Sequence, residues 1–150
     1  MDDVKSRTEQ STKMKIWNVA AKVANLDREI DFVNGIGGKT VLDEMLEIEG
    51  RTYRVALMQI ADKYLHLFEE AVYENQLEGP LQNGLCHVVF EVGDLHTARK
   101  RALDSGAVEV MPAQFISAGF GTRDVAFFRS PGGFLFEFAE IHEHKVPELA

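Results

Sequence analysis

The chain carries one segment twice, and this repeat constrains the fold more than any other feature of its 150 residues. Residues 19–27 (VAAKVANLD) align with residues 88–96 (VVFEVGDLH) at an offset of 69 positions, and the same offset places Gly37 on Gly106. Self-similarity at a fixed offset is typical of a duplicated supersecondary unit. We therefore expect two copies of one unit, with corresponding positions converging on a shared site.

Hydrophobic periodicity predicts the same order of elements in both copies. The first copy reads as a strand, a helix and three strands: 15–23, 26 to the glycines at 35–38, 40–48, 53–59 and 63–69. The second copy reads as a strand, a helix and three strands: 85–92, 94–103, 109–112 followed by a loop, 123–129 and 134–141. The pattern predicts an α+β protein made of two βαβββ repeats.

Neither repeat can bury the face of its four-stranded sheet alone, so we expect the two to pair side by side. The result is a barrel-like cup with the helices outside. The predicted organisation is a polar N-terminal arm (1–13), one domain (14–141) and a C-terminal tail (142–150) that frays. Within the domain we distinguish repeat one, a connector and repeat two: 14–70, 71–83 and 84–141.

The composition limits the kinds of partner that the protein can bind. The net charge is −8 and no run of Lys or Arg occurs, which argues against nucleic acid and anionic membrane as partners. No stretch approaches the roughly 18 apolar residues of a membrane span, and the first 13 residues lack the apolar core of a signal peptide. The single Cys86 excludes an intramolecular disulfide. We expect a cytoplasmic protein.

The last predicted strand, 134–141, carries a candidate functional carboxylate. Successive side chains of a strand face opposite sides, so Phe134, Phe136 and Phe138 share the face beneath a helix, and Glu137 faces into the cup. A buried carboxylate is costly unless it is paired or bound to a cation. The alternative is a Glu on a solvated sheet face.

Three other side chains occupy repeat-related positions. His66 lies in the last strand of the first copy, where Glu137 lies in the second, and His87 begins the first strand of the second copy, where Asn18 lies in the first. Two His and one carboxylate from separate strands are typical of an open metal site. A hydrogen-bonded structural role is the alternative for each His. Asn18 offers only a carbonyl oxygen, or a hydrogen bond to a ligand residue.

Other polar and glycine-rich segments leave alternatives open. Arg123 could neutralise an anionic substrate or pair with a surface carboxylate. Residues 119–122 (GFGT) could form a mobile loop over the cup or an ordinary hairpin connection. Residues 35–39 (GIGGK) lack the spacing of a phosphate-binding loop and read as a helix stop. We expect Cys86 to face the core. The remaining histidines are expected to be exposed: His96, His142 and His144.

The chain resembles the vicinal-oxygen-chelate superfamily over about residues 14–141. The segments that carry the resemblance are CHVVFEVGDLHTARKRALDSGA (86–107), RDVAFFRSPGGFLFEFAE (123–140) and NVAAKVANLDREIDFVNGIGGKTV in the first copy. This superfamily includes glyoxalase I, methylmalonyl-CoA epimerase, bleomycin- and fosfomycin-resistance proteins and extradiol dioxygenases. Its members place ligands early in the first strand and in the last strand of each copy, which here are Asn18, His66, His87 and Glu137.

The chain departs from the superfamily's pattern at some of these positions. Asn18 replaces the usual His, and His66 stands where Glu or Gln is common. Ser130 and Gly132 replace the usual acidic residues of the last turn.

The resemblance implies a metal-dependent enzyme of lyase or isomerase type. One divalent ion (iron, nickel, zinc, manganese or cobalt) would chelate neighbouring oxygens of a small organic substrate and stabilise an enolate-like intermediate. Glu137 and His66 are the candidate catalytic groups, as ligand or base. The alternatives are a metal-free protein that binds or sequesters a small molecule, and an iron(II) extradiol-type dioxygenase. The resemblance also implies a homodimer.

Overall fold

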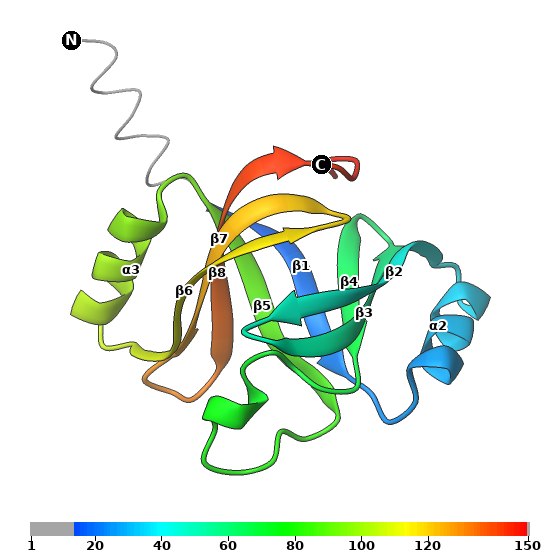
Figure 1. Ribbon diagram of the computed structural model, residues 1–150, viewed down its shortest axis with the longest axis horizontal. Coiled ribbons are helices and arrows are strands. Elements are labelled where there is room, and N and C mark those ends of the chain that lie inside the picture. The colour runs from blue at the N-terminus through cyan, green and yellow to red at the C-terminus, as the bar shows by residue number, and fades with distance from the viewer. Residues whose placement is uncertain (1–13, 150) are drawn as a thin grey trace, which may run out of the picture.

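The computed structural model describes residues 14–149, so the predicted arm 1–13 lies outside the described residues. The described part contains eight strands, two α-helices and a short 3-10 helix (Figure 1). Their bounds are β1 Met14–Lys22, α2 Leu26–Gly35, β2 Lys39–Ile48, β3 Arg51–Ile60, β4 Lys63–Phe68, η1 Glu74–Gln76, β5 Gly84–Val92, α3 Leu95–Asp104, β6 Val108–Ala118, β7 Gly121–Arg129 and β8 Leu135–His144. The α+β class and the two βαβββ repeats are confirmed.

The eight strands form one curled sheet in the order β2-β3-β4-β1-β5-β8-β7-β6. Strand β1 runs antiparallel to β5, with Val19 opposite Val88, while the β1–β4 and β5–β8 pairs are parallel. Val19 and Val88 are equivalent positions of the two repeats, so an approximate two-fold axis passes through this pair. The two repeats seen in the sequence are therefore related in space by a rotation about this axis.

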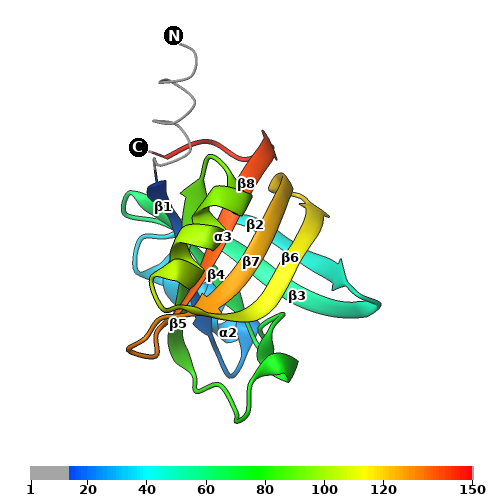
Figure 2. The same ribbon diagram turned by 90° about the vertical axis from the view of Figure 1, so that its left-hand side faces the viewer.

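The helices cover the outer, convex surface of the sheet, and the concave surface holds its own core. Helix α2 packs through Leu26 and Val33 against one half, and α3 packs through Leu95 and Ala98 against the other half (Figures 1 and 2). The largest apolar cluster lies inside the cup. Neither helix of the described part has the length and apolarity that a membrane crossing requires.

Both helices begin with the same capping arrangement. The side chains of Asn25 and Asp94, which are equivalent positions, each accept a backbone hydrogen bond of 3.0 Å from the first helical turn. The next residue in each copy, Leu26 or Leu95, donates its N–H at 2.8 Å to a carboxylate. These carboxylates belong to Glu69, the residue after β4, and to Glu140 on β8. Each repeat thus holds the start of its helix beside its own last strand.

The predicted loop over residues 113–122 is wrong. Strand β6 continues to Ala118 and turns directly into β7 at Gly121. Pro112 favours a strand end in the sequence, but β6 is an edge strand, where Pro is tolerated. Its register against β7 shifts on both sides of Met111, and these irregularities accommodate the proline.

The last strand and the tail also differ from expectation. Strand β8 extends to His144, the backbone N–H of Lys145 donates to the carbonyl of Phe120 at 2.9 Å, and Val146 is buried. The hydroxyl of Tyr64 donates to the carbonyl of Pro147. The tail is therefore packed against the cup. Phe134 precedes β8 and is 56% exposed, so only Phe136 and Phe138 of the expected trio are core residues.

Candidate functional site

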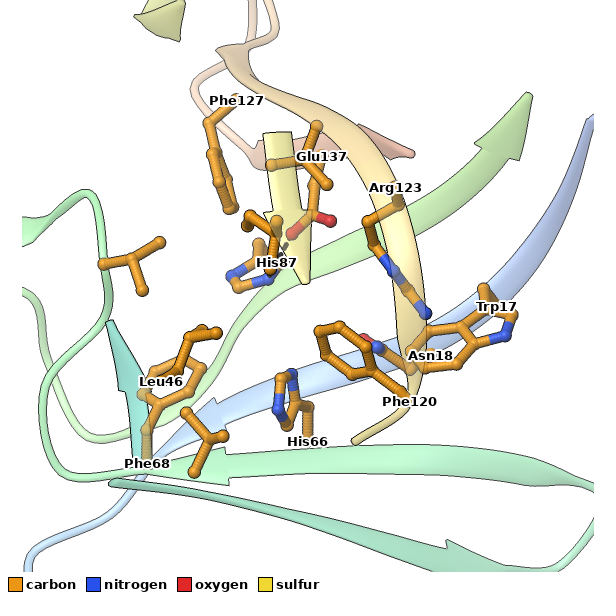
Figure 3. Close-up of a pocket in the computed structure, with 14 residues that line it drawn as sticks. Trp17, Asn18, Leu46, His66, Phe68, His87, Phe120, Arg123, Phe127 and Glu137 are labelled. Atoms are coloured by element: carbon orange, nitrogen blue, oxygen red, sulfur yellow. Dashed lines mark ion pairs between the residues drawn. The ribbon is translucent and has the colours of Figure 1, made fainter. Parts of the chain in front are cut away.

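A small cavity of about 40 Å³ lies inside the cup, where a single water occupies roughly 10–15 Å³ by the same measure. It therefore holds the reacting group of a substrate rather than a whole large molecule. Apolar side chains make most of its wall, and the polar ones are few (Figure 3). Its polar lining residues are Asn18, His66, His87, Arg123 and Glu137.

Four central strands bring the repeat-related residues to this cavity. Asn18 lies on β1, His66 on β4, His87 on β5 and Glu137 on β8. The register is symmetric, because His66 pairs with Ala20 across β4–β1 while Glu137 pairs with the equivalent Val89 across β8–β5. The structure thus gathers all four predicted residues, while their roles as ligands or catalysts stay predictions.

His87 is held by hydrogen bonding at one ring nitrogen and faces the cavity with the other. The hydroxyl of Tyr73 lies 2.8 Å from Nδ1, and Nε2 lies 3.7 Å from Oε1 of Glu137 (Figure 3). Burial, with a smaller contribution from the nearby His66, lowers the pKa of His87 to about 3. The imidazole is therefore neutral near pH 7. A neutral imidazole nitrogen is a good metal ligand.

Burial also decides the charge of the other two groups. It raises the pKa of Glu137 to about 8, against the opposing charge of Arg123. It lowers the pKa of His66 to about 4, with Arg123 adding to the shift. The site without an ion therefore favours an uncharged Glu137 and an uncharged His66. A cation bound between them would reverse the preference of Glu137 and make the carboxylate the stable form.

Arg123 enters the same cavity from β7 and is only 2% exposed. Its guanidinium lies over the rings of Trp17 and Phe120, at 4.3 and 3.8 Å from their centroids. Burial lowers the pKa of Arg123 to about 10, so the group remains charged near neutral pH. Its Nε and Nη2 atoms have no hydrogen-bond partner. The expectation that Arg123 neutralises an anionic substrate stays open, whereas a surface ion pair is excluded by its burial.

The donor types in the cavity fit a divalent ion, although the three ligand groups are not drawn together. Nε2 of His66 and Oδ1 of Asn18 are buried without a partner, as expected of atoms that await a ligand. However, the ligand atoms of His66, His87 and Glu137 do not all lie within 4.8 Å of one another, and Figure 3 shows His66 apart from the other two. A bound ion would require His66 to move closer.

A different group of residues meets that distance criterion. Among residues 14–149, only Asp124, Glu140 and His142 place three ligand atoms within 4.8 Å of one another. They are half-buried or exposed, and Nε2 of His142 already lies 2.9 Å from Oδ2 of Asp124. The predicted exposure of His96 and His142 is confirmed, whereas His144 is half-buried. This outer triplet serves below as a control for adventitious metal binding.

Sequence reasoning missed three residues that shape the site. Tyr73 lies in the connector, outside the repeat, so no counterpart pointed to it. Trp17 and Phe120 were not connected with Arg123, although Trp17 directly precedes Asn18. Residues 119–120 form a tight turn between β6 and β7, and Phe120 is buried in the cavity wall. The alternative of an ordinary hairpin connection is therefore correct for this segment.

Comparison with known proteins agrees with the geometry. No family model matches the chain. The chain is 27% identical over 128 residues to lactoylglutathione lyase from Neisseria meningitidis, covering 85% of this chain and 91% of that protein. The similarity therefore spans nearly the whole domain, including both repeats.

Solved structures share the fold. Methylmalonyl-CoA epimerase from Streptomyces coelicolor, in a complex with 2-nitronate-propionyl-CoA, superposes with a TM-score of 0.66 at 19% identity, covering 86% of this chain and 98% of that chain. A variant of 4-hydroxymandelate synthase from the same organism gives 0.64 at 14% identity, covering 91% of this chain and 51% of that one.

The sequence similarity and the shared fold confirm the resemblance to the vicinal-oxygen-chelate superfamily that was stated from the sequence. Within the superfamily, the proteins it resembles include a lyase and an epimerase.

Proposed function

We propose that the protein is a metal-dependent enzyme of lyase or isomerase type that moves a proton on a small organic substrate with neighbouring oxygens. The observation that carries this proposal is the convergence of His66, His87 and Glu137, from three strands, on one small and largely apolar cavity. The similarity to lactoylglutathione lyase and the fold shared with methylmalonyl-CoA epimerase support the reaction type.

Four side chains of the cavity would supply the donor atoms that hold the ion. Nε2 of His87 and Oε1 of Glu137 face one another, Nε2 of His66 has no other partner, and Oδ1 of Asn18 is a weaker fourth donor. Tyr73 fixes the orientation of the His87 ring through Nδ1. A bound divalent ion would supply Lewis-acid stabilisation of negative charge on the substrate's oxygens.

Glu137 is the proposed proton carrier. With an ion bound the group would be a carboxylate, and burial, which favours the protonated form, would oppose the effect of the ion and keep that carboxylate basic enough to take a proton from an acidified C–H. The same group then returns the proton to the same or a neighbouring carbon. His66, neutral near pH 7, is the second candidate base. Phe68, Phe120 and Phe127 line the cavity and exclude bulk water from the exchange.

Metal content tests the first half of the proposal. The protein would be purified without a metal-affinity tag, and its bound metals would be counted by mass spectrometry. We expect one ion per chain in the wild type and in His142→Ala, which alters only the outer triplet. His87→Ala and Glu137→Ala should lose it. A wild type free of metal, or inner variants that keep it, would contradict a catalytic ion in the cup.

Proton exchange tests the second half. The substrates named by the similar proteins, lactoylglutathione and methylmalonyl-CoA, would be incubated with the metal-loaded protein in D2O and followed by NMR. Deuterium should enter beside a carbonyl with the wild type and not with Glu137→Gln. Exchange at equal rates in the two proteins would refute the role of Glu137. Iron in the metal analysis, with oxygen consumption, would point instead to a dioxygenase.

A metal-free binding protein is the second candidate. It is favoured by the separation of His66 from the His87–Glu137 pair and by the positive charge of Arg123 in the same cavity. It predicts ligand binding without metal and without deuterium exchange. We further infer from the resemblance a homodimer located in the cytoplasm. Light scattering after size-exclusion chromatography and fractionation of cells test these two points.

A further inference from the structure

The in-plane edge of the Arg123 guanidinium is the most conspicuous unfilled polar surface in the cup. The two atoms without partners, Nε and Nη2, lie along one edge of the planar guanidinium and together form one fork. Among residues 14–149, no carboxylate pairs with these two atoms, and Glu137 and Glu91 act on the guanidinium only through space. A buried charge without a partner is costly, so a chain that keeps one there has a use for it.

The aromatic contacts do not pair this fork. Cζ of Arg123 lies 4.3 Å from the centroid of the Trp17 ring and 3.8 Å from that of Phe120, and these rings are perpendicular, with centroids 6.0 Å apart. They therefore contact the guanidinium from two adjacent directions by cation–π attraction. Such contacts restrain the group and leave Nε and Nη2 without a hydrogen-bond acceptor. An arginine held in this way loses little conformational freedom when it binds a ligand.

The same chain shows what such a fork binds. At Arg54, Nε lies 3.0 Å from Oδ1 of Asp43 and Nη2 lies 2.8 Å from Oδ2, a two-point contact with a planar carboxylate. In Arg123 the same two atoms are buried without a partner, and the residue lines the cavity. We propose that Arg123 is the anchor for a carboxylate of the substrate, so that the substrate is a small carboxylic acid or carries one beside its reacting carbon.

This inference rests on the proposed function for its meaning, since it names the substrate class of the same site. It places the carboxylate between the Trp17–Phe120 pair and the His87–Glu137 pair, because Arg123 lies between these pairs in the wall of the cavity (Figure 3). The volume of about 40 Å³ accommodates a carboxylate and its adjoining carbon. The remainder of a larger substrate would lie outside.

Trp17 makes the test direct, because it is the only tryptophan of the chain and it contacts the guanidinium. Its fluorescence would be titrated with L-lactate and malonate, and with the uncharged lactamide and malonamide. We expect a saturable change with the acids and none with the amides. Arg123→Met should abolish it, and Arg123→Lys should weaken binding at least tenfold, because an ammonium lacks the fork.

Controls separate this inference from the catalytic proposal. Arg54→Lys changes an arginine whose fork is already filled, and should titrate as the wild type does. Titration after EDTA treatment should still show binding of the acids, even where the metal analysis finds no ion. Equal responses to acids and amides, or an unchanged response in Arg123→Met, would overturn the anchor while leaving the metal result standing. If Arg123→Met does not fold, the contrast between acids and amides in the wild type still decides.

Discussion

The hydroxyl of Tyr73 lies 2.8 Å from Nδ1 of His87, so the connector between the repeats sets the orientation of a ring on β5. Burial raises the pKa of the Tyr73 hydroxyl far above its ordinary value, so it stays a neutral hydrogen-bonding group. The contact leaves Nε2 as the free nitrogen, facing Glu137. A connector outside the duplicated segment thus completes a site that the duplication begins.

Removing this hydroxyl should weaken metal binding without abolishing it. In Tyr73→Phe the His87 ring loses the partner that orients it, and we expect a loss of metal affinity of roughly tenfold to a hundredfold. Competition with a chelating dye measures this. Tyr64→Phe is the matched control, since that hydroxyl bonds to the carbonyl of Pro147. Equal affinities of Tyr73→Phe and the wild type would show that the contact does not tune His87.

The metal-free protein should be most stable near pH 6.5. The pKa of Glu137 is raised to about 8 from 4.5, so its contribution is complete at low pH and is lost as pH rises through 8. The pKa values of His66 and His87 are lowered from 6.5 to about 4 and about 3, so their contributions are complete above 6.5 and are lost as pH falls. Below 6.5 the two histidines outweigh the single Glu.

Glu137→Gln should remove the decline on the alkaline side. Between pH 6.5 and 8 the wild type should lose about 2 kcal/mol of unfolding free energy, one proton's worth over that interval. Urea unfolding of EDTA-treated protein at a series of pH values measures the slope. Glu143→Gln, an exposed change, should keep the wild-type slope. A wild type with a flat profile above 6.5 would argue against a buried, protonated Glu137.

Restoring the symmetry of the repeat should strengthen metal binding. Asn18 and His87 occupy equivalent positions about the Val19–Val88 pair, and Asn18 lines the cavity. Asn18→His adds an imidazole ligand, for which we expect a gain in metal affinity of about tenfold or more. Dye competition compares it with Asn18→Ala, which should show no gain. A fall in affinity in Asn18→His would mean that position 18 cannot turn a ligand toward the ion.

Gly121 should be intolerant of any side chain. It has φ of +122°, and a Cβ built there would lie 1.8 Å from the carbonyl oxygen of Glu143 on β8. We expect Gly121→Ala to lower the unfolding free energy by at least about 2 kcal/mol, because the strand pair would have to separate. Gly79→Ala, with no neighbour within 4 Å, is the control for urea unfolding. Equal stabilities would show that β7 and β8 can shift apart at this end.

The parts of the fold and site that the sequence predicted are those that the repeat determines. The offset between the copies identified the strands that carry Asn18, His66, His87 and Glu137, and the spatial two-fold axis places them in one cavity. Glu69 and Glu140 are 71 residues apart, as are His66 and Glu137, so these carboxylates, which hold the two helices, could also have been predicted from the sequence. Because the repeats are related by a two-fold axis, equivalent positions in the sequence lie at equivalent places in the cup.

The parts that sequence reasoning missed depend on features without a counterpart in the other repeat. Tyr73 belongs to the connector. Arg123 contacts Trp17 on β1 as well as Phe120 in the turn before β7. No local pattern predicts the contact with Trp17, which lies more than 100 residues away in the chain. Pro112 favoured a strand end locally, but the edge position of β6 accommodated it. Each of these features depends on contacts between residues that are distant in the sequence.

The curled sheet has two free ends, because β2 and β6 are the outermost strands in its order. Across this seam, the backbone N–H of Gly119 donates to the carboxylate of Glu44 at 2.9–3.0 Å, and the side-chain amide of Gln114 donates to Glu49 at 3.1 Å. These contacts can exchange with water while every strand ladder stays intact. The two edges of the sheet are therefore joined by hydrogen bonds to side chains and not by a strand ladder. We expect a ligand to enter where these edges separate beside Phe120, while the strand pairs stay intact.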